Sequence, residues 1–386
     1  MNIAVDLRAL GGERISGVKV YLTSLLEELF RLDKKNRYFL WWNSATEDFP
    51  ASLKIPKSPR FKLIQTKFSN RKLNLRLSLT GAPPLDQLIL VAEKRKDQID
   101  LFWLPDPRPV ALSQSCKLVT TIHDLSPTLY PKFFSAKTRF WHKLLNSKKI
   151  ARQADAVLAV SKSTKNDLVD VWGIPEEKIA VTQLAAAANL KKVSLRNIRK
   201  KYNLPEKFIL SLSTLEPRKN LKILIRAFTE LKEEMQISHE LVLAGELDRK
   251  IFSDPGIVME HGTWNMNQNV RFTGFVEEKD KAALLSAAEV FCFPSIYEGF
   301  GIPPLEAMRC GTPVLAADIS ALREVCGDAA KFIPPKNVDA WKVALAKIIS
   351  DEELRKSLTE RGIKQAKKFS WERCAQETIK AFNALK

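Results

Sequence analysis

The fold of this chain of 386 residues is decided by the stretch Phe293-Pro-Ser-Ile-Tyr-Glu298-Gly-Phe-Gly-Ile-Pro-Pro-Leu-Glu306-Ala-Met-Arg-Cys-Gly311. An apolar run, Val290–Phe293, comes directly before it and predicts a buried strand. A loop rich in glycine and proline follows, and Pro303 opens a short helix that ends near Gly311. The order of strand, loop and helix is typical of an α/β unit in a parallel sheet.

Two acids stand eight positions apart in this stretch, Glu298 on the loop and Glu306 in what we expect to be the first helical turn. A helix N-terminus reached by a tight glycine loop binds anions, because its free N–H groups and its dipole point at the ligand. Two acids beside an anion site are costly unless they hold hydroxyl groups. A nucleotide sugar offers both a diphosphate and hydroxyls. Glu298 is the more informative acid, since an acid in a first helical turn such as Glu306 is favoured by the dipole alone.

Strands and helices alternate along the whole chain, which favours an α/β fold with parallel sheets and crossover helices. The strands that we expect are Asn2–Asp6, Tyr38–Trp42, Phe61–Ile64, Asp100–Leu104, Leu118–Ile122, Ala156–Val160, Ile179–Thr182, Phe208–Leu212, Glu240–Ala244, Val270–Phe272, Val290–Phe293, Pro313–Ala317 and Lys331–Ile333. The helices include Val18–Arg31, Ala136–Gln153, Lys162–Val171 with Ser161 as its cap, and Trp371–Leu385.

The length predicts two domains. We expect an N-terminal domain at 1–190, a C-terminal domain at 191–370, and a terminal helix at 371–386 that crosses back to the first domain. By the family resemblance given below, the first would be the acceptor-side domain and the second would bind the nucleotide sugar. The pattern fades at 185–200, which we interpret as the linker. Two such halves predict a ligand cleft between them, at the C-terminal ends of their strands.

Composition indicates a soluble globular protein, with 45% hydrophobic and 27% charged residues. No apolar run is long enough to span a bilayer, and the N-terminal stretch is interpreted as a first strand rather than a signal peptide. Five scattered cysteines form no C-x-x-C pair, which argues against a zinc site or disulfide framework and for a reducing cytoplasm.

The net charge of +18 is unevenly spread. Residues 1–200 carry 35 Lys and Arg against 18 Asp and Glu, and residues 201–386 carry 27 against 26. The segments 51–80 and 131–150 contain basic residues and no acid, and the second interleaves them with Phe140 and Trp141. This mixture suits an anionic membrane surface, and the alternative is a solvated basic face. We expect no nucleic-acid partner, because no motif for one accompanies the charge.

Cationic and imidazole side chains follow two of the expected strands. Arg218 and Lys219 lie on the loop after Phe208–Leu212, where arginine can hold a phosphate by two hydrogen bonds and lysine acts as a point charge. His123 follows Leu118–Ile122, where it either contacts a sugar hydroxyl or is structural.

Other features bear on phosphate and metal binding. Gly17 lies in a glycine-bearing loop after the first strand, a weak signal for phosphate contact because the spacing is not G-x-G-x-x-G. The chain has no D-x-D pair and no histidines spaced as ligands on one helix. We therefore expect no metal and no cofactor, so that cations and the helix dipole must stabilise the leaving diphosphate.

These residues resemble glycosyltransferase family 4. The E-x7-E pattern of that family is present as Glu298 and Glu306, and Leu215-Glu-Pro-Arg-Lys-Asn220, Phe272-Thr-Gly-Phe275 and Gly311-Thr-Pro-Val314 are similar to family positions. The resemblance implies a retaining enzyme of the GT-B fold, with two facing Rossmann-like domains. The subgroup that it resembles contains envelope and exopolysaccharide enzymes, HepE-type proteins among them.

The resemblance also implies a role for each residue. Glu306 would hold the ribose hydroxyls, while Glu298 would lie by the transferred sugar. Arg218 and Lys219 would hold the diphosphate, and His123 would face the reacting side of the sugar. The remaining substrate-binding positions would be Gly17, Thr214, Val276 near the base, Phe300 and Gly301 through their backbone, Ile302 and Leu305.

The function that we expect is transfer of a hexose from a nucleotide sugar to a lipid-linked saccharide in envelope or exopolysaccharide synthesis, without a metal. The donor is UDP-glucose, with GDP-mannose as the alternative. The acceptor is lipid-linked or a soluble oligosaccharide, and the enzyme is cytoplasmic and peripheral on the inner face of the plasma membrane. An alternative of another class is a GT-B-type sugar-nucleotide epimerase, against which the E-x7-E pattern argues.

Overall fold

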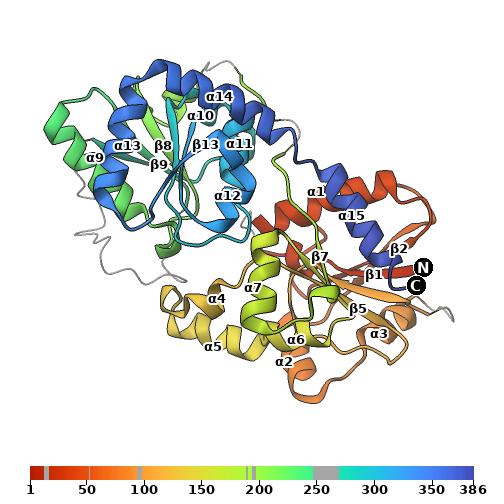
Figure 1. The fold of residues 1–386 in the computed structure, drawn as a ribbon. Coiled ribbons are helices and arrows are strands. Elements are labelled where there is room, and N and C mark those ends of the chain that lie inside the picture. The colour runs from red at the N-terminus through yellow and green to blue at the C-terminus, as the bar shows by residue number, and fades with distance from the viewer. Residues whose placement is uncertain (13–16, 52, 94–97, 188–189, 194–196, 247–268) are drawn as a thin grey trace. The chain divides into compact units, whose positions relative to one another are not determined.

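The computed structural model describes residues 1–12, 17–51, 53–93, 98–187, 190–193, 197–246 and 269–386. The chain divides into two compact units (Figure 1). Unit 1 contains Met1–Leu125, Phe140–Leu184 and Trp371–Lys386, and unit 2 contains Ser126–Arg139 and Ala185–Ser370. This division groups the C-terminal helix with unit 1 and moves the segment Ser126–Arg139 to unit 2, whereas the sequence alone assigned residues 1–190 to one domain.

Unit 1 is built on a parallel sheet, in which the described strands have the order β3-β2-β1-β4-β5-β6-β7. Their bounds are β1 Asn2–Asp6, β2 Arg37–Asn43, β3 Phe61–Thr66, β4 Leu101–Leu104, β5 Lys117–Ile122, β6 Ala156–Ala159 and β7 Ile179–Val181. The four residues of β4 are all buried, as expected for a strand covered on both faces. From β1 the chain first adds β2 and β3 on one side of the sheet and then β4 to β7 on the other side. The order in which strands are added therefore reverses between β1 and β4.

The helices of unit 1 are α1 Gly17–Leu32, α2 Asn70–Thr80, α3 Leu85–Ala92, α6 Ser147–Gln153, α7 Lys162–Trp172 and α15 Trp371–Asn383. The helix α7 begins as predicted, because the Ser161 hydroxyl accepts a hydrogen bond from the backbone N–H of Thr164 at 2.9 Å. The helix α15 packs against α1, with the rings of Tyr21 and Trp371 6.2 Å apart.

One helix that the sequence predicted as continuous is broken in the structure. The stretch Ala136–Gln153 forms two helices, α5 Ala136–Leu145 and α6 Ser147–Gln153. Asn146 breaks it by adopting the left-handed conformation, with φ of 47°, and its side chain caps α6 by accepting from the Lys149 N–H. Asparagine tolerates this conformation better than most residues, and it is a good N-cap. The short helix α4 Ser126–Leu129 lies before α5.

Unit 2 is built on a second parallel sheet with the described strands in the order β10-β9-β8-β11-β12-β13. Their bounds are β8 Phe208–Leu212, β9 Glu240–Ala244, β10 Val270–Gly274, β11 Val290–Phe293, β12 Val314–Ala317 and β13 Ala330–Ile333. The chain order reverses here between β8 and β11, the point at which open α/β sheets have a crevice beyond their strands' C-terminal ends.

The helices of unit 2 are α8 Ile198–Lys201, α9 Leu221–Met235, α10 Glu278–Ala287, α11 Ile302–Arg309, α12 Ser320–Cys326, α13 Val338–Ser350 and α14 Glu352–Ala366. Figure 1 shows α9 and α13 on one face of the sheet and α11 and α12 on the other. Right-handed crossovers require this, because the strands that α9 and α11 connect progress in opposite directions across the sheet.

The cysteines, the helices and the linker region also bear on the predictions for the whole chain. The five cysteines are free and buried. Within the described ranges, no helix combines the length and apolarity that crossing a bilayer requires. Part of the expected linker, at 188–189 and 194–196, lies outside the described residues.

Candidate active site

The loops after β8 and β11 meet at the switch point of the second sheet, where they form the candidate site. After β8, Pro217–Lys219 form one turn of 3-10 helix. The backbone N–H of Ile296, on the other loop, donates to the Arg218 carbonyl at 2.9 Å. The Asn220 amide donates to the carbonyls of Pro294 at 3.1 Å and Pro335 at 2.6 Å, so the two loops are held in one arrangement.

Glu298 lies between the two cations that the sequence singled out. Lys219 Nζ is 2.6 Å from Glu298 Oε1, and Arg218 Nη1 is 2.8 Å from Glu298 Oε2. Arg218 also forms an ion pair with Glu216 at 2.6 Å. Lys219 and Glu298 are both buried, each with 8% of its surface exposed. Arg218, Lys219, Glu216 and Glu298 together carry two positive and two negative formal charges. The three ion pairs that join them lie at hydrogen-bonding distance.

The pKa of Glu298 reflects two opposed effects. Burial alone would raise it, because a buried carboxylate loses its hydration. The attraction of Arg218 and Lys219 outweighs this and lowers the pKa of Glu298 below its ordinary value. The carboxylate is therefore ionised at neutral pH.

The residue that caps the N-terminus of α11 is Gly301, whose φ of 110° is in the region that favours glycine. A Cβ at Gly301 would come within 2.6 Å of the Leu322 side chain, so the position also lacks space. Phe300 is buried and packs edge-on against Phe369, with ring centroids 5.7 Å apart. Leu305 is buried on the helix, while Ile302 at its first position is half-buried.

The expectation for Glu306 was wrong in one respect. The helix begins at Ile302, so Glu306 is its fifth residue and its first turn contains no acid. The N-terminal dipole therefore does not explain this carboxylate. Glu306 has 3% of its surface exposed, and Lys281 Nζ of α10 lies 2.9 Å from its Oε1.

Burial raises the pKa of Glu306 above its ordinary value, and Lys281 only partly opposes this. Lys281 was not singled out in the sequence. It lies on α10 and also pairs with Glu278 at 2.8 Å, so only the packing of α10 against α11 could identify it. The Glu306 carboxyl is thus costly to keep charged.

The remaining unit 2 candidates lie on neighbouring loops. Val276 is buried and Thr214 is exposed. Between them, the backbone of Gly245 approaches that of Ser213, and a Cβ at Gly245 would lie 1.8 Å from the Ser213 carbonyl oxygen. The position accepts only glycine, with φ of 137°.

His123 and Gly17 lie in unit 1. His123 follows β5, and its Nε2 is 2.8 Å from the Pro105 carbonyl oxygen. A carbonyl only accepts, so Nε2 carries the proton in this bond. Tyr21 packs edge-on against the imidazole at 4.8 Å. Gly17 is the first residue of α1 and is exposed, and residues 13–16 before it lie outside the described residues.

The described side chains of His, Cys, Asp and Glu nowhere gather in a group of three that could hold a metal ion. The structure thus brings together Arg218, Lys219 and Glu298 on two loops, with Phe300 to Glu306 on the helix that follows.

Comparison with known protein families assigns both halves of the chain. Residues 15–184 match Glycosyltransferase Family 4, and residues 195–365 match Glycosyl transferases group 1. The O-antigen chain mannosyltransferase B of Escherichia coli is 33% identical over 279 residues, which cover 70% of this chain and 71% of that enzyme. The serotype-specific mannosyltransferase WbdA of Escherichia coli is 32% identical over 274 residues. These cover 70% of this chain and 34% of WbdA.

Among solved structures, Anabaena HepE in complex with UDP and glucose is similar in fold, with a TM-score of 0.68 and 17% identity over 100% of both chains. That similarity and the two parallel-sheet units establish the GT-B fold of Rossmann-like domains that the sequence predicted. The chain belongs to glycosyltransferase family 4 and is a glycosyltransferase.

Proposed function

We propose that this glycosyltransferase moves a hexose from a nucleotide sugar to a saccharide acceptor in envelope polysaccharide synthesis. The observation that carries the proposal is the convergence of Arg218 and Lys219 on Glu298 beside the N-terminus of α11. Cations and a helix terminus suit the diphosphate of the donor, and an ionised carboxylate suits its sugar. The similarity to O-antigen mannosyltransferases supports the polysaccharide context.

We propose GDP-mannose as the donor. The sequence alone favoured UDP-glucose, but relatives that are 33% and 32% identical over the aligned 70% of this chain are named mannosyltransferases. The structure of HepE with UDP-glucose supports the rival donor less, because at 18% identity that likeness concerns the fold alone.

Each candidate residue has a proposed part in this reaction. Arg218 and Lys219 hold the diphosphate, Glu298 contacts the sugar, and Glu306 binds the ribose hydroxyls. The remaining positions proposed to contact the donor are Gly17, Thr214, Val276 near the base, Phe300 and Gly301 through their backbone, Ile302 and Leu305. His123 faces the reacting sugar, with Nδ1 as its acceptor, since Nε2–H is engaged with Pro105.

We propose a retaining reaction that requires no metal. The bond between the anomeric carbon and the phosphate oxygen breaks as negative charge builds on the diphosphate, which Arg218, Lys219 and the α11 N-terminus stabilise. The acceptor hydroxyl forms its new bond on the same face of the sugar. Its proton passes to the departing phosphate oxygen, so no protein nucleophile is needed.

Calorimetric titration of the purified chain with GDP-mannose, UDP-glucose, GDP and UDP tests the proposal. We expect GDP-mannose to bind, and to bind more tightly than UDP-glucose, with no divalent metal added. Tighter binding of UDP-glucose would contradict the choice of donor but not the site. If none of the four bound, the proposed function would be wrong.

A further inference from the structure

Tyr21 is a buried tyrosine beside His123 that the proposed reaction does not use. It is the fifth residue of α1, and none of its surface is exposed. Its ring and the His123 imidazole lie edge to face, with centroids 4.8 Å apart and ring planes at 82°. Aromatic pairs prefer this arrangement. Tyr21 therefore borders the histidine that is proposed to face the reacting sugar.

A single hydrogen bond does not fix the imidazole of His123. Its Nε2–H donates to the Pro105 carbonyl at 2.8 Å, which sets the direction of one ring nitrogen. The ring can still tilt about this bond, because the χ2 angle of a histidine has only broad preferences. The Tyr21 ring removes that freedom, since tilting would push the imidazole into it. The hydrogen bond and the ring contact together determine the position of Nδ1.

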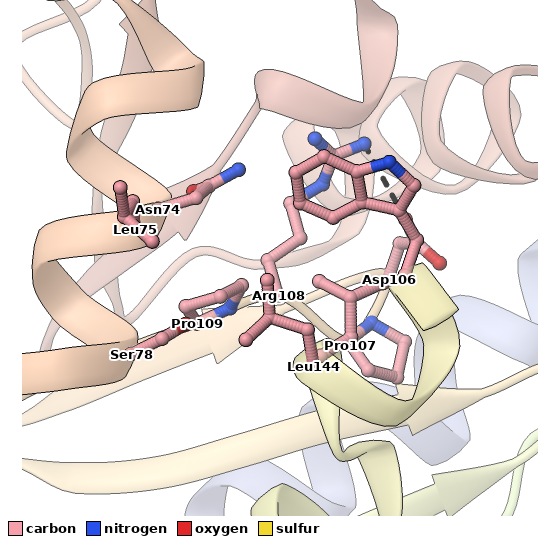
Figure 2. A pocket seen from close by; sticks show the side chains of 10 residues that line it. Asn74, Leu75, Ser78, Asp106, Pro107, Arg108, Pro109 and Leu144 are labelled. Carbon is pink, nitrogen blue, oxygen red and sulfur yellow. Dashed lines mark ion pairs between the residues drawn. The ribbon is translucent and has the colours of Figure 1, made fainter. Parts of the chain in front are cut away.

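The loop that provides the Pro105 carbonyl is itself held in place. Figure 2 shows the next residues of this loop where they line a pocket in unit 1, among them Asp106 and Arg108, which form an ion pair at 3.4 Å. The buried Arg8 guanidinium donates to the Pro109 carbonyl of the same loop at 3.5 Å. The acceptor of the imidazole N–H therefore lies on an anchored loop.

A buried hydrogen-bond network holds Tyr21 in its orientation. The Tyr21 hydroxyl and Thr121 Oγ1 are 3.0 Å apart, and the same Oγ1 accepts the Trp103 indole N–H at 3.0 Å. None of the three residues has exposed surface, so breaking these bonds would leave buried polar groups without partners. Burial also raises the pKa of Tyr21 well above its ordinary value, so the hydroxyl keeps its proton. Tyr21 cannot turn away from His123 without breaking the network.

The terminal helix α15 supports this network at two points. The ring centroid of Trp371, its first residue, lies 6.2 Å from that of Tyr21, and the ring of Phe382 lies 5.5 Å from that of Trp103. Both α15 residues are buried, and Figure 1 shows α15 beside α1. The last helix of the chain thus contributes to the orientation of His123, which it does not need to contact.

We infer that Tyr21 is a positioning residue for His123, held in that role by Thr121 and by Trp371 of the terminal helix, an inference that rests on the proposed function. In the proposed reaction the acceptor atom of the histidine is Nδ1, whose position depends on the tilt of the ring. A misplacement of about 1 Å can cost on the order of a hundredfold in rate. Tyr21 should therefore affect the rate of transfer more than the affinity for the donor, whose diphosphate is held by residues of unit 2.

The first test observes the imidazole directly, by NMR of the full chain with isotope-labelled histidine, in which His123→Asn identifies the signals of His123. We expect wild-type His123 to carry its proton on Nε2. Tyr21→Leu, which removes the ring and keeps much of its volume, should move these signals and populate the second tautomer. Tyr21→Phe keeps the ring and should stay nearer to wild type. Trp371→Leu, a milder change, should move the signals in the same direction as Tyr21→Leu.

The matched control is Tyr38→Leu. Tyr38 lies on β2 of the same unit with 1% of its surface exposed, its hydroxyl donates to Asp33 at 2.6 Å, and its ring centroid is 5.8 Å from that of Phe61. Loss of this side chain should destabilise unit 1 as Tyr21→Leu does and leave the His123 signals unchanged. All variants are compared well below their thermal midpoints, so that unfolding does not contribute.

The second test measures release of GDP from GDP-mannose in the presence of methyl α-mannoside. We expect Tyr21→Leu to lower the rate about tenfold or more and to leave the calorimetric affinity for GDP-mannose unchanged, with Tyr21→Phe restoring most of the rate. The inference is overturned if Tyr21→Leu leaves the His123 signals or the rate as in wild type, or if Tyr38→Leu moves the signals equally. A wild-type chain that releases no GDP contradicts the proposed function, while the NMR comparison still decides whether Tyr21 orients His123.

Discussion

Glu298 is the residue on which the candidate active site depends. It pairs with two adjacent cations, Arg218 and Lys219, and with Glu216 it balances their charge, while the two cations keep it ionised. A diphosphate that binds Arg218 and Lys219 has to share them with this carboxylate. The same contact therefore serves the stability of the ligand-free protein and, in the proposed reaction, the placement of the sugar.

The substitution Glu298→Gln should destabilise unit 2 by about 3–5 kcal/mol, because it removes the counter-ion of the buried Lys219 and one acidic partner of the half-buried Arg218. Urea unfolding at pH 7 measures this, with Glu233→Gln on the exposed side of α9 as the control, for which about 0.5 kcal/mol or less is expected. Transfer activity should be lost as well. An equal effect of the two substitutions on stability would contradict the ion-pair assignment.

The stabilisation by Glu298 also has a predicted pH dependence. Its pKa is lower in the folded protein than in the unfolded chain, so its contribution is present above the ordinary pKa of a glutamate and is lost as the pH falls through the folded value. The wild-type chain should therefore lose stability on acidification more steeply than Glu298→Gln does. The thermal midpoints of both proteins from pH 3 to pH 7 provide the measurement.

Glu306 should show the opposite pH dependence. Its pKa is raised by burial, so the folded protein holds the proton more tightly than the unfolded chain, and stability falls as the pH rises from the ordinary value through the folded one. The Gln variant lacks this loss. The midpoint of Glu306→Gln relative to wild type should thus increase with pH across this window, and a constant difference would show that the pKa is not raised.

At the scale of elements, close contacts between backbones hold the loops of unit 2 together. Gly245 follows β9 and lies against Ser213, which follows β8, so these loops meet without a side chain between them. The Gly245 N–H donates to the Gly274 carbonyl at 2.9 Å, and the Leu215 N–H to the Glu246 carbonyl at 3.0 Å. Three strand ends are thus tied together beside the candidate site.

The substitution Gly245→Ala should cost about 3 kcal/mol or more, because the new Cβ would clash with the Ser213 carbonyl in addition to the strain of a positive φ. The control Gly274→Ala isolates the strain, since its φ is 69° but a Cβ there meets nothing within 4 Å. That variant should lose about 1–2 kcal/mol. Urea unfolding of the two variants distinguishes these costs, and equal losses would show that the clash is relieved.

Elements were predictable from the sequence where the signal is local. The strands β1, β8, β9 and β11 have their predicted bounds, because each is an apolar run closed by polar or turn residues. The helix α2 was missed, since its two buried residues, Leu73 and Leu77, leave little apolar periodicity among basic side chains. The break at Asn146 was missed because a single left-handed residue leaves the flanking helical pattern unchanged.

At the scale of the whole molecule, the excess positive charge belongs to the first half of the chain. In α5 the residues Lys137, Arg139 and Lys143 are exposed beside Phe140, and this helix has no buried residue. In α2, Leu79 has 72% exposure in a helix that also lacks acids. We propose that these helices contact an anionic membrane, which would bring the enzyme to a lipid-linked acceptor.

Co-sedimentation with vesicles tests this proposal. The chain should bind phosphatidylglycerol-containing vesicles and not phosphatidylcholine vesicles, and less at high salt, because each basic residue near the surface contributes about 1 kcal/mol. Phe140→Glu should remove most of the binding. The control Val343→Glu, at a residue with 64% exposure on α13, should not. Equal binding to neutral vesicles, or none to either kind, would favour a solvated basic face.

The sequence by itself determined the α/β class, nearly all strand positions and the family. Apolar runs, glycine and proline punctuation and the E-x7-E spacing are all short-range features. The tertiary structure decided which charges meet. The pairs Lys219–Glu298 and Lys281–Glu306 join residues that are far apart in the chain. Burial and Coulomb energies depend on distance in space, and strand order, which sets those distances, is not encoded locally.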